Sequence, residues 1–313
     1  MRTRVITGVI FTLIVLAFLL PGPALPWLPL VFFALIALAM AIELQQALVK
    51  LDSGVSLIAS MLGGLLCLSP VVVWLLYRDL RPGWSFITLQ DPELDAIWRT
   101  DMIWLLGLGI AVAAAFAFLY TIAVTLSLVL SRGPNSLPSA LDSTMSSWYI
   151  GLPFATVPLF MFAVPNGWRW LLIGVFSAWI SDVLCYFVGS KFCHTPIVPH
   201  ISPNKTLEGT VGGLAGSALI GGLFFMLFMR NAPPVPRGWG EAFAFGAVAG
   251  LLLSMVEQLG DWLASAIKRR SHIKDFSHIL PGHGGLLDRF DGVLLTLPTT
   301  LALSVIYLVL QSS

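Results

Sequence analysis

Charge is what this sequence has least of. Only 11% of its 313 residues are charged, 57% are hydrophobic, and the mean hydropathy is +0.89. Such a composition is far too apolar for an ordinary soluble domain. The formal net charge of +1 gives no electrostatic reason to expect a nucleic-acid partner, because non-specific nucleic-acid binding requires a surplus of Lys and Arg. The sequence therefore predicts an integral membrane protein.

Cysteine is also scarce, and one common nucleotide-binding motif is absent. The three cysteines, Cys67, Cys185 and Cys193, lie in or beside apolar stretches and lack metal-ligand spacing. We expect them to be small buried hydrophobic residues without a disulfide framework. The sequence contains no P-loop of the Gly-x-x-x-x-Gly-Lys-Ser/Thr type, which argues against that class of nucleotide-binding protein.

Long apolar runs are abundant. A helix needs about 20 residues to cross the ~30 Å hydrocarbon core of a bilayer. These runs predict an all-α, polytopic transmembrane helical bundle of about nine spans, with the first span retained in the protein. They lie near residues 5–20, 27–43, 55–77, 103–131, 146–164, 170–190, 208–229, 241–263 and 291–311. We treat residues 1–313 as one integral membrane domain, with N-terminal spans in 1–165 and C-terminal spans and loops in 170–313.

The distribution of positive charge predicts the orientation. Placing the N-terminus in the cytoplasm puts eleven of the 17 Lys and Arg residues inside and six outside, as the positive-inside rule favours. Small residues recur at intervals of four in two spans, a pattern that allows helix backbones to approach closely in lipid. We interpret both ladders as helix packing without chemistry; they are Gly209, Gly213, Ser217 and Gly221, and Ala242, Gly246, Gly250 and Ser254.

Polar residues concentrate in the segment from Asp261 to Asp291. This segment contains nine of the 33 charged residues. A solvated loop is the simpler interpretation of such a run. The spacing argues against it, because Asp261 and Lys268 share a helix face with Glu257, and Asp288 and Asp291 are three apart. Carboxylates at the ends of two spans require partners or a cation. Hard oxygen ligands of this kind suit a magnesium-like ion that also takes substrate phosphates.

A second polar segment runs from Asp182 to Glu208. Asp182 and Tyr186 are four apart and share a helix face, and the sequence SPNKTLEG follows from Ser202 to Gly209. Two predicted spans separate this segment from the first one, so both loops are expected on the same, cytoplasmic, side. The alternative is that Ser202 and its neighbours simply start a helix, with Thr206 or Glu208 near its cap.

Together these residues resemble a known signature. The run SAIKRRSHIKDFSHILPGHGGLLDRFD, from Ser265 to Asp291, is similar to the signature of phosphatidate cytidylyltransferases, the CDP-diacylglycerol synthases. SPNKTLEG is similar to the Ser-Pro-Lys-Lys-Thr-x-Glu-Gly run of that family, with Asn204 where lysine is common. The resemblance covers roughly residues 175–295, whereas the N-terminal half agrees only in consisting of hydrophobic spans.

The resemblance implies a reaction of CTP with phosphatidic acid that gives CDP-diacylglycerol and pyrophosphate for phospholipid synthesis. It implies Mg²⁺, alone or with a second cation, a homodimer in contact with membrane lipids, and a bacterial cytoplasmic (inner) membrane with the active site facing the cytoplasm. The candidate metal ligands are Asp261, Asp288 and Asp291, and the candidate catalytic residues are Asp261, Asp288, Lys205, Lys268 and Arg289. The candidate substrate- and phosphate-binding residues are Asp182, Tyr186, Ser202, Lys205, Thr206, Glu208, Ser265, Lys268, Arg269, Lys274, His283, Gly284 and Gly285.

Three other functions compete with this one. A CTP-dependent polyprenol or phytol kinase would transfer the terminal phosphate and release CDP. A secondary transporter would also contain intramembrane charges, but it would have matching broken segments in two halves, whereas here the polarity lies almost wholly in the second half. A CDP-alcohol phosphotransferase is disfavoured because no Asp-Gly-x-x-Ala-Arg run is present.

Overall fold

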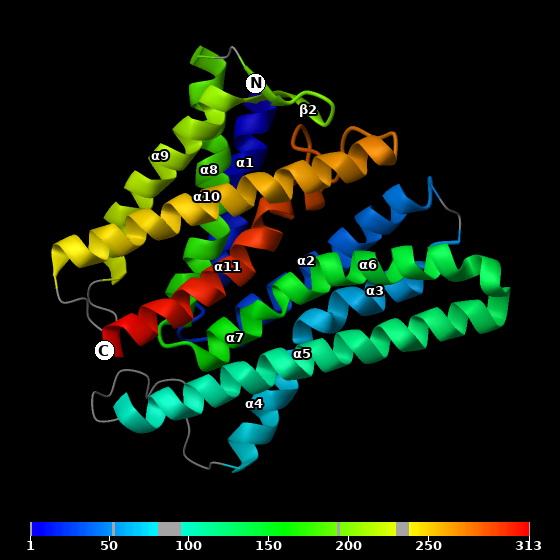
Figure 1. The fold of residues 1–313 in the computed structure, drawn as a ribbon, viewed down its shortest axis with the longest axis horizontal. Coiled ribbons are helices and arrows are strands. Elements are labelled where there is room, and N and C mark those ends of the chain that lie inside the picture. The colour runs from blue at the N-terminus through cyan, green and yellow to red at the C-terminus, as the bar shows by residue number, and fades with distance from the viewer. Residues whose placement is uncertain (1, 52–53, 81–94, 193–194, 230–237, 313) are drawn as a thin grey trace. The chain divides into compact units, whose positions relative to one another are not determined.

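The computed structural model describes residues 2–51, 54–80, 95–192, 195–229 and 238–312 (Figure 1). These residues are almost entirely helical, which confirms the predicted all-α class. The chain forms two compact units: unit 1 comprises Met1–Trp168 and Arg270–Arg289, and unit 2 comprises Arg169–Arg269 and Phe290–Ser313. The segment Arg270–Arg289 thus groups with the N-terminal helices rather than with the C-terminal ones.

Helix length and composition confirm a multi-pass membrane protein. The described part of the chain contains eight helices long and apolar enough to cross a bilayer, together with a shorter apolar helix at Ile6–Leu19. The eight candidate spans are Trp27–Leu48, Leu57–Leu76, Ile103–Arg132, Pro134–Ala163, Gly167–Lys191, Leu207–Met229, Trp239–Arg270 and Leu287–Leu310.

Unit 1 contains the first seven helices and two short 3₁₀ turns. Their bounds are α1 Arg2–Leu19, α2 Trp27–Leu48, α3 Leu57–Gly64, η1 Leu65–Leu68, α4 Ser69–Leu80, α5 Asp95–Arg132, η4 Pro134–Ser136, α6 Leu137–Phe154 and α7 Thr156–Ala163. Helices α2, α3, α5 and α6 pack against one another. Hydroxyl groups join α3 to α6: Ser143 Oγ accepts from Ser56 N at 3.0 Å, and the Oγ atoms of Ser60 and Ser146 lie 3.4 Å apart. Such bonds hold helices together where lipid supplies no hydrophobic driving force between them.

Unit 2 contains the remaining helices and one small β-hairpin. Its elements are α8 Gly167–Phe192, β1 Pro196–Val198, β2 Ser202–Thr206, α9 Leu207–Phe224, the π-helical turn η5 Phe225–Met229, α10 Trp239–Arg270 and α11 Leu287–Ser312. The first residues of α8 and α11 are counted in unit 1. β1 and β2 pair antiparallel, with Pro196 opposite Thr206. The hairpin was not predicted, because SPNKTLEG lacks the alternating apolar pattern typical of a strand.

The small-residue ladders are helix contacts, as predicted. A Cβ atom added at Gly250 of α10 would overlap the backbone oxygen of Ser217 in α9, and one added at Gly221 would overlap the backbone oxygen of Gly246. On the other face of α9, a Cβ at Gly213 would overlap the sulfur of Cys185. The backbones of these helices therefore approach as closely as glycine allows.

The described cysteines behave as expected. Cys67 and Cys185 are buried and free of disulfides. Cys193 lies outside the described residues.

Replacing Gly250 by Ala should destabilise unit 2, because a methyl group has no room against the α9 backbone. We expect Gly250→Ala to cost about 1–3 kcal/mol, the range for overpacking. Gly240→Ala is the control in the same helix, since nothing lies within 4 Å of an added Cβ there. It should be neutral or stabilising by up to ~1 kcal/mol through helix propensity. Thermal unfolding of both variants in detergent measures the difference; equal melting temperatures would contradict the contact.

Candidate active site

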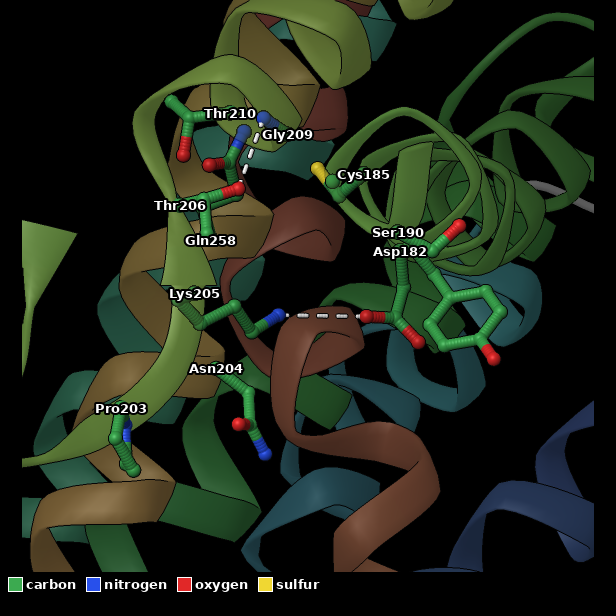
Figure 2. A pocket seen from close by; sticks show the side chains of 12 residues that line it. Asp182, Cys185, Ser190, Pro203, Asn204, Lys205, Thr206, Gly209, Thr210 and Gln258 are labelled. Carbon is green, nitrogen blue, oxygen red and sulfur yellow. Dashed lines mark hydrogen bonds and ion pairs between the residues drawn. The ribbon is translucent and has the colours of Figure 1, made fainter. Parts of the chain in front are cut away.

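Unit 2 contains a pocket of about 480 Å³ that is lined mostly by polar residues. This volume lies within the ~300–1,000 Å³ range of small-molecule sites. The pocket is bounded by the C-terminal part of α8, strand β2, the first turn of α9 and one side chain of α10 (Figure 2). Its lining residues are Asp182, Cys185, Tyr186, Gly189, Ser190, Pro203, Asn204, Lys205, Thr206, Gly209, Thr210 and Gln258.

The turn from β2 into α9 fixes the backbone that presents Lys205. Thr206 caps α9, with its Oγ1 accepting from Gly209 N at 3.2 Å. Leu207 N donates to Thr195 O at 2.8 Å, and Glu208 Oε1 accepts from Thr195 Oγ1 at 3.2 Å. Thr206 is therefore the N-cap of α9 and also lines the pocket, whereas Glu208 in the first turn holds Thr195.

A close approach of α8 and α9 forms the inner wall of the pocket. A Cβ atom at Gly209 would lie 2.8 Å from the backbone oxygen of Cys185 and 3.2 Å from the Cα of Gly189. Any larger residue at Gly209 would push α9 away from α8 and move the capped turn with it. This contact explains the glycine that ends SPNKTLEG.

Lys205 lies between two carboxylates. Its ammonium nitrogen is 2.6 Å from Asp261 Oδ2 and 3.4 Å from Asp182 Oδ1, and Figure 2 shows it pointing toward Asp182. Burial alone lowers the pKa of Lys205, but the charges of Asp261 and Asp182 raise it by more, so that its pKa lies above the ordinary lysine value. The two carboxylates therefore stabilise the charged form of the ammonium group at the pocket wall.

Two more carboxylates lie near this group on α10 and α11. Glu257 is buried, and its Oε2 accepts from Ser181 Oγ at 2.6 Å. Asp291 interacts electrostatically with Asp261 and Lys268. The two helices meet through glycine, because a Cβ at Gly260 would lie 2.7 Å from the backbone oxygen of Asp291. Three acidic side chains, Asp261, Asp182 and Glu257, therefore act on the ammonium group of Lys205, and Asp291 adds a fourth carboxylate beside Asp261.

The described residues include no group of three His, Cys, Asp or Glu side chains placed to hold a metal ion by themselves. Asp261 and Asp291 instead offer two carboxylates close in space. Mg²⁺ is commonly bound by one or two carboxylates together with substrate phosphates and water. The donor set of unit 2 therefore fits an ion that arrives with a phosphate ligand.

The signature residues from Arg270 to Arg289 belong to unit 1. Asp288, in the first turn of α11, accepts through Oδ2 from Phe276 N at 2.8 Å and Gly285 N at 2.9 Å. Arg289 Nε donates to His283 O at 3.0 Å. Gly284 has a φ of +81°, in the left-handed region that glycine adopts without strain. The segment is thus an ordered turn that leads into α11.

The Gly284–Gly285 pair lies against two of the protein's own carboxylates, those of Asp288 and Glu43. In the structure, Gly285 N donates to Asp288, while a Cβ at Gly285 would lie 2.7 Å from both carboxyl oxygens of Glu43. The phosphate-binding role that the resemblance implies for Gly284 and Gly285 stays a prediction.

The structure sorts the candidate residues into two groups. Within unit 2, Asp182, Lys205 and Asp261 interact directly, and Tyr186 and Thr206 line the same pocket. Arg269 Nε donates to Ile201 O at 3.1 Å and so ties the hairpin to the end of α10. The other candidates in unit 2 are Ser202 in β2, Glu208 in α9, Ser265 and Lys268 in α10, and Asp291 in α11. The candidates in unit 1 are Lys274, His283, Gly284, Gly285, Asp288 and Arg289.

Several pocket and cluster residues were not among the sequence candidates. Ser190 lies eight residues after Asp182, so helical periodicity could have found it. Gln258 and Thr210 carry no sequence signal of this kind. Glu43 was missed because it lies in the N-terminal half, far along the chain from both motifs.

Removing the Lys205 charge should destabilise unit 2 by leaving Asp261 without its partner. Lys205 and Asp261 side chains are only 22% and 19% exposed. We expect Lys205→Gln to cost about 1–3 kcal/mol, the penalty for an unsatisfied buried group. Adding Asp261→Asn should restore most of this stability, because the double variant has no unpaired charge there. Thermal unfolding measures both effects.

The pH dependence of the same variant tests the charge state. Because the folded pKa of Lys205 is raised, the ion pairs stabilise fully below the ordinary lysine pKa of ~10.4 and fail only as the pH rises through the higher folded value. The stability difference between wild type and Lys205→Gln should therefore stay constant from neutral pH to about pH 9. Lys191→Gln, at an exposed lysine of α8, is the control and should change little.

The sequence of this chain is similar to those of known proteins. The model of the cytidylyltransferase family matches residues 2–307. Similar proteins include a phosphatidate cytidylyltransferase of Aquifex aeolicus, 41% identical over 129 residues, which are 41% of this chain and 44% of that protein. The phosphatidate cytidylyltransferase of Staphylococcus saprophyticus is 35% identical over 171 residues, and that of Staphylococcus aureus is 36% identical over 172 residues. Each of these two alignments covers 54% of this chain and 61% of the relative, so the chain spans about half the length of the curated relatives it matches. Because the family model extends over nearly the entire sequence, from the first helix to the last, the chain belongs to the cytidylyltransferase family.

Proposed function

We propose that this protein is a CTP:phosphatidate cytidylyltransferase, which makes CDP-diacylglycerol and pyrophosphate from CTP and phosphatidic acid. The observation that carries the proposal is the pocket of unit 2, where Lys205 of the SPNKTLEG run lies between Asp182 and Asp261. Membership of the cytidylyltransferase family and the names of the relatives support the choice of nucleotide and lipid.

The reaction needs no nucleophilic side chain. A phosphate oxygen of phosphatidic acid attacks the α-phosphorus of CTP, a new phosphorus–oxygen bond forms, and the bond between the α-phosphorus and the oxygen bridging to the β-phosphate breaks. Pyrophosphate leaves with the electron pair of that bond. The protein's task is to bring two polyanions together and to stabilise the charge on the leaving group.

Lys205 is the group we assign to phosphate binding in unit 2. Its ammonium remains protonated because the neighbouring carboxylates raise its pKa. It lines the pocket and is 22% exposed, so an incoming phosphate oxygen can reach it. Lys268 and Arg269, at the end of α10, are the next cationic groups of this unit.

Asp261 and Asp291 are the residues we assign to a divalent cation, with Mg²⁺ as the expected ion. The cation would neutralise charge on the nucleotide phosphates when bound. Asp261 now pairs with Lys205, so binding of an ion there would release the ammonium group toward the phosphates. Asp182, with a side chain that is 55% exposed, remains beside Lys205 in either state.

Asp288 has a different environment. Its Oδ2 atom accepts two backbone hydrogen bonds within unit 1, which position the carboxylate at the start of α11. We keep Asp288 as a candidate metal ligand, and Lys274 and Arg289 as candidate phosphate-binding residues, on the strength of the signature.

The same resemblance supports the finer assignments of location and assembly. We propose the bacterial cytoplasmic (inner) membrane, with the active site facing the cytoplasm, where CTP is available. The excess of Lys and Arg on that side of the predicted topology supports the orientation. We also propose a homodimer in contact with membrane lipids.

Product analysis with position-labelled CTP tests the function. Purified protein is incubated with phosphatidic acid, Mg²⁺ and CTP labelled in its α-phosphate. Cytidylyl transfer should place the label in a lipid and release unlabelled pyrophosphate. A lipid kinase would leave the label in CDP and transfer label to lipid only from the γ-position. Labelled lipid from γ-labelled CTP alone would therefore overturn the proposal.

The cation assignment predicts a large kinetic effect at Asp261. Asp261→Asn keeps the size of the side chain and removes its charge, so turnover should fall ~100- to 1,000-fold, the loss typical of one preorganised charge-stabilising group. The Mg²⁺ concentration required for half-maximal rate should rise as well. Glu241→Gln, in the first turn of the same helix, is the control and should leave both quantities unchanged. Near-normal turnover of Asp261→Asn would remove Asp261 from the ligand set.

A further inference from the structure

Glu43 is a buried carboxylate that the proposed mechanism does not use. It lies in α2, within the candidate span Trp27–Leu48, and only 1% of its surface is exposed. Acidic residues inside apolar spans are rare and are retained when they have partners or a function.

Three hydrogen bonds connect Glu43 to the signature segment, and all of them lie within unit 1. Oε1 accepts from Ser277 Oγ at 2.5 Å and from Leu286 N at 2.9 Å, while Oε2 accepts from Leu287 N at 2.7 Å. Leu287 is the first residue of α11, so Glu43 supplies acceptors for amides at the helix N-terminus that have no partner within the helix. One side chain thus holds both ends of the turn 277–287.

The surrounding chain is shaped to admit this carboxylate. An added Cβ at Gly285 would lie 2.7 Å from both carboxyl oxygens of Glu43, so a side chain there would displace them. The preceding amide, Gly285 N, donates to Asp288 instead. Glu43 and Asp288 therefore divide the amides of Gly285, Leu286 and Leu287 between them.

The contact connects two parts of the sequence that the motifs treat separately. Glu43 and Ser277 are 234 residues apart. Ser277 and Gly285 are both signature residues; Ser277 donates to Glu43 of α2, and Gly285 leaves room for the same carboxylate. A contact of this kind fixes the backbone on which Lys274, Asp288 and Arg289 are carried.

We propose that Glu43 is a positioning residue for the reaction. Its carboxylate holds residues 277–287 in the one conformation that directs Asp288 and the flanking basic side chains. The inference rests on the proposed function, because the loop it orders is the family signature. It assigns to the second helix a role beyond spanning the bilayer.

The test combines hydrogen exchange with kinetics on the full-length protein in lipid nanodiscs. Glu43→Gln keeps the shape of the side chain but replaces one acceptor oxygen with an amide nitrogen. We expect exchange at Leu286 and Leu287 to accelerate at least about tenfold, the effect of losing a hydrogen bond to a charged group. We expect kcat to fall ~10- to 100-fold, the loss typical of residues that orient a site from behind. The KM for CTP should change much less, because a positioning residue acts through the loop and not on the nucleotide.

Ser277→Ala provides a check from the loop side. It removes the hydroxyl that donates to Glu43 and leaves the two backbone bonds in place. Because the two residues share a bond, the effects of Glu43→Gln and Ser277→Ala on kcat should be less than additive in the double variant. Strict additivity would overturn the proposed connection.

Gln45→Met is the matched control for a purely structural role. Gln45 is a buried polar residue of the same helix, and its Nε2 donates to Val55 O at 3.4 Å, away from the signature segment. This variant should lower thermal stability while leaving kcat and the exchange of Leu286 and Leu287 unchanged. An equal fall in kcat for Gln45→Met would overturn the proposal, as would faster exchange in Glu43→Gln with an unchanged kcat.

Failure of the function and failure of this inference are distinguishable. A wild-type protein that transfers no cytidylyl group would overturn the proposed function, and the positioning role with it. An active wild type whose Glu43→Gln variant shows unchanged exchange and turnover would overturn the positioning role alone.

Discussion

The constraint on which this structure depends is that a buried charge needs a partner. A charged side chain at the centre of a membrane helix costs ~2.5–3.5 kcal/mol on insertion scales, so each one must bond to something within the protein. Glu43 bonds to a loop hydroxyl and two amides, Asp261 to Lys205, and Glu257 to Ser181. Each of these bonds joins segments that are far apart in sequence. The acidic residues therefore organise the fold as well as providing candidate chemistry.

In unit 1 this constraint explains why a C-terminal segment packs with N-terminal helices. Residues 270–289 carry the signature, and Glu43 of α2 offers acceptors to two of their amides at the start of α11, which have no partner within the helix. The first helix contributes as well, because a Cβ added at Gly8 of α1 would lie 3.4 Å from the His283 ring. The N-terminal spans are thus structural supports of the signature.

In unit 2 the same constraint produces the ion pairs of the candidate site. Glycine contacts bring α8, α9, α10 and α11 close enough for their acidic residues to share one region. The ammonium of Lys205 balances part of that negative charge and keeps its proton as a result. Lys268 interacts with Asp291 in the same unit, so the carboxylates of this region face more than one ammonium group. The pocket that adjoins it is large enough for a small molecule.

The sequence by itself determined the helical membrane class, the two polar segments and the packing ladders, because hydropathy and spacing are local properties that survive in any fold. It also determined that Asp182 and Tyr186 share a helix face, and both line the pocket. Only the tertiary structure decided that Lys205 pairs with Asp261, that Thr206 is a helix cap, and that SPNKT forms a strand. Only the tertiary structure also revealed Glu43, because a hydrogen bond across 234 residues leaves no periodic trace in the sequence and depends on how helices and loops meet in space.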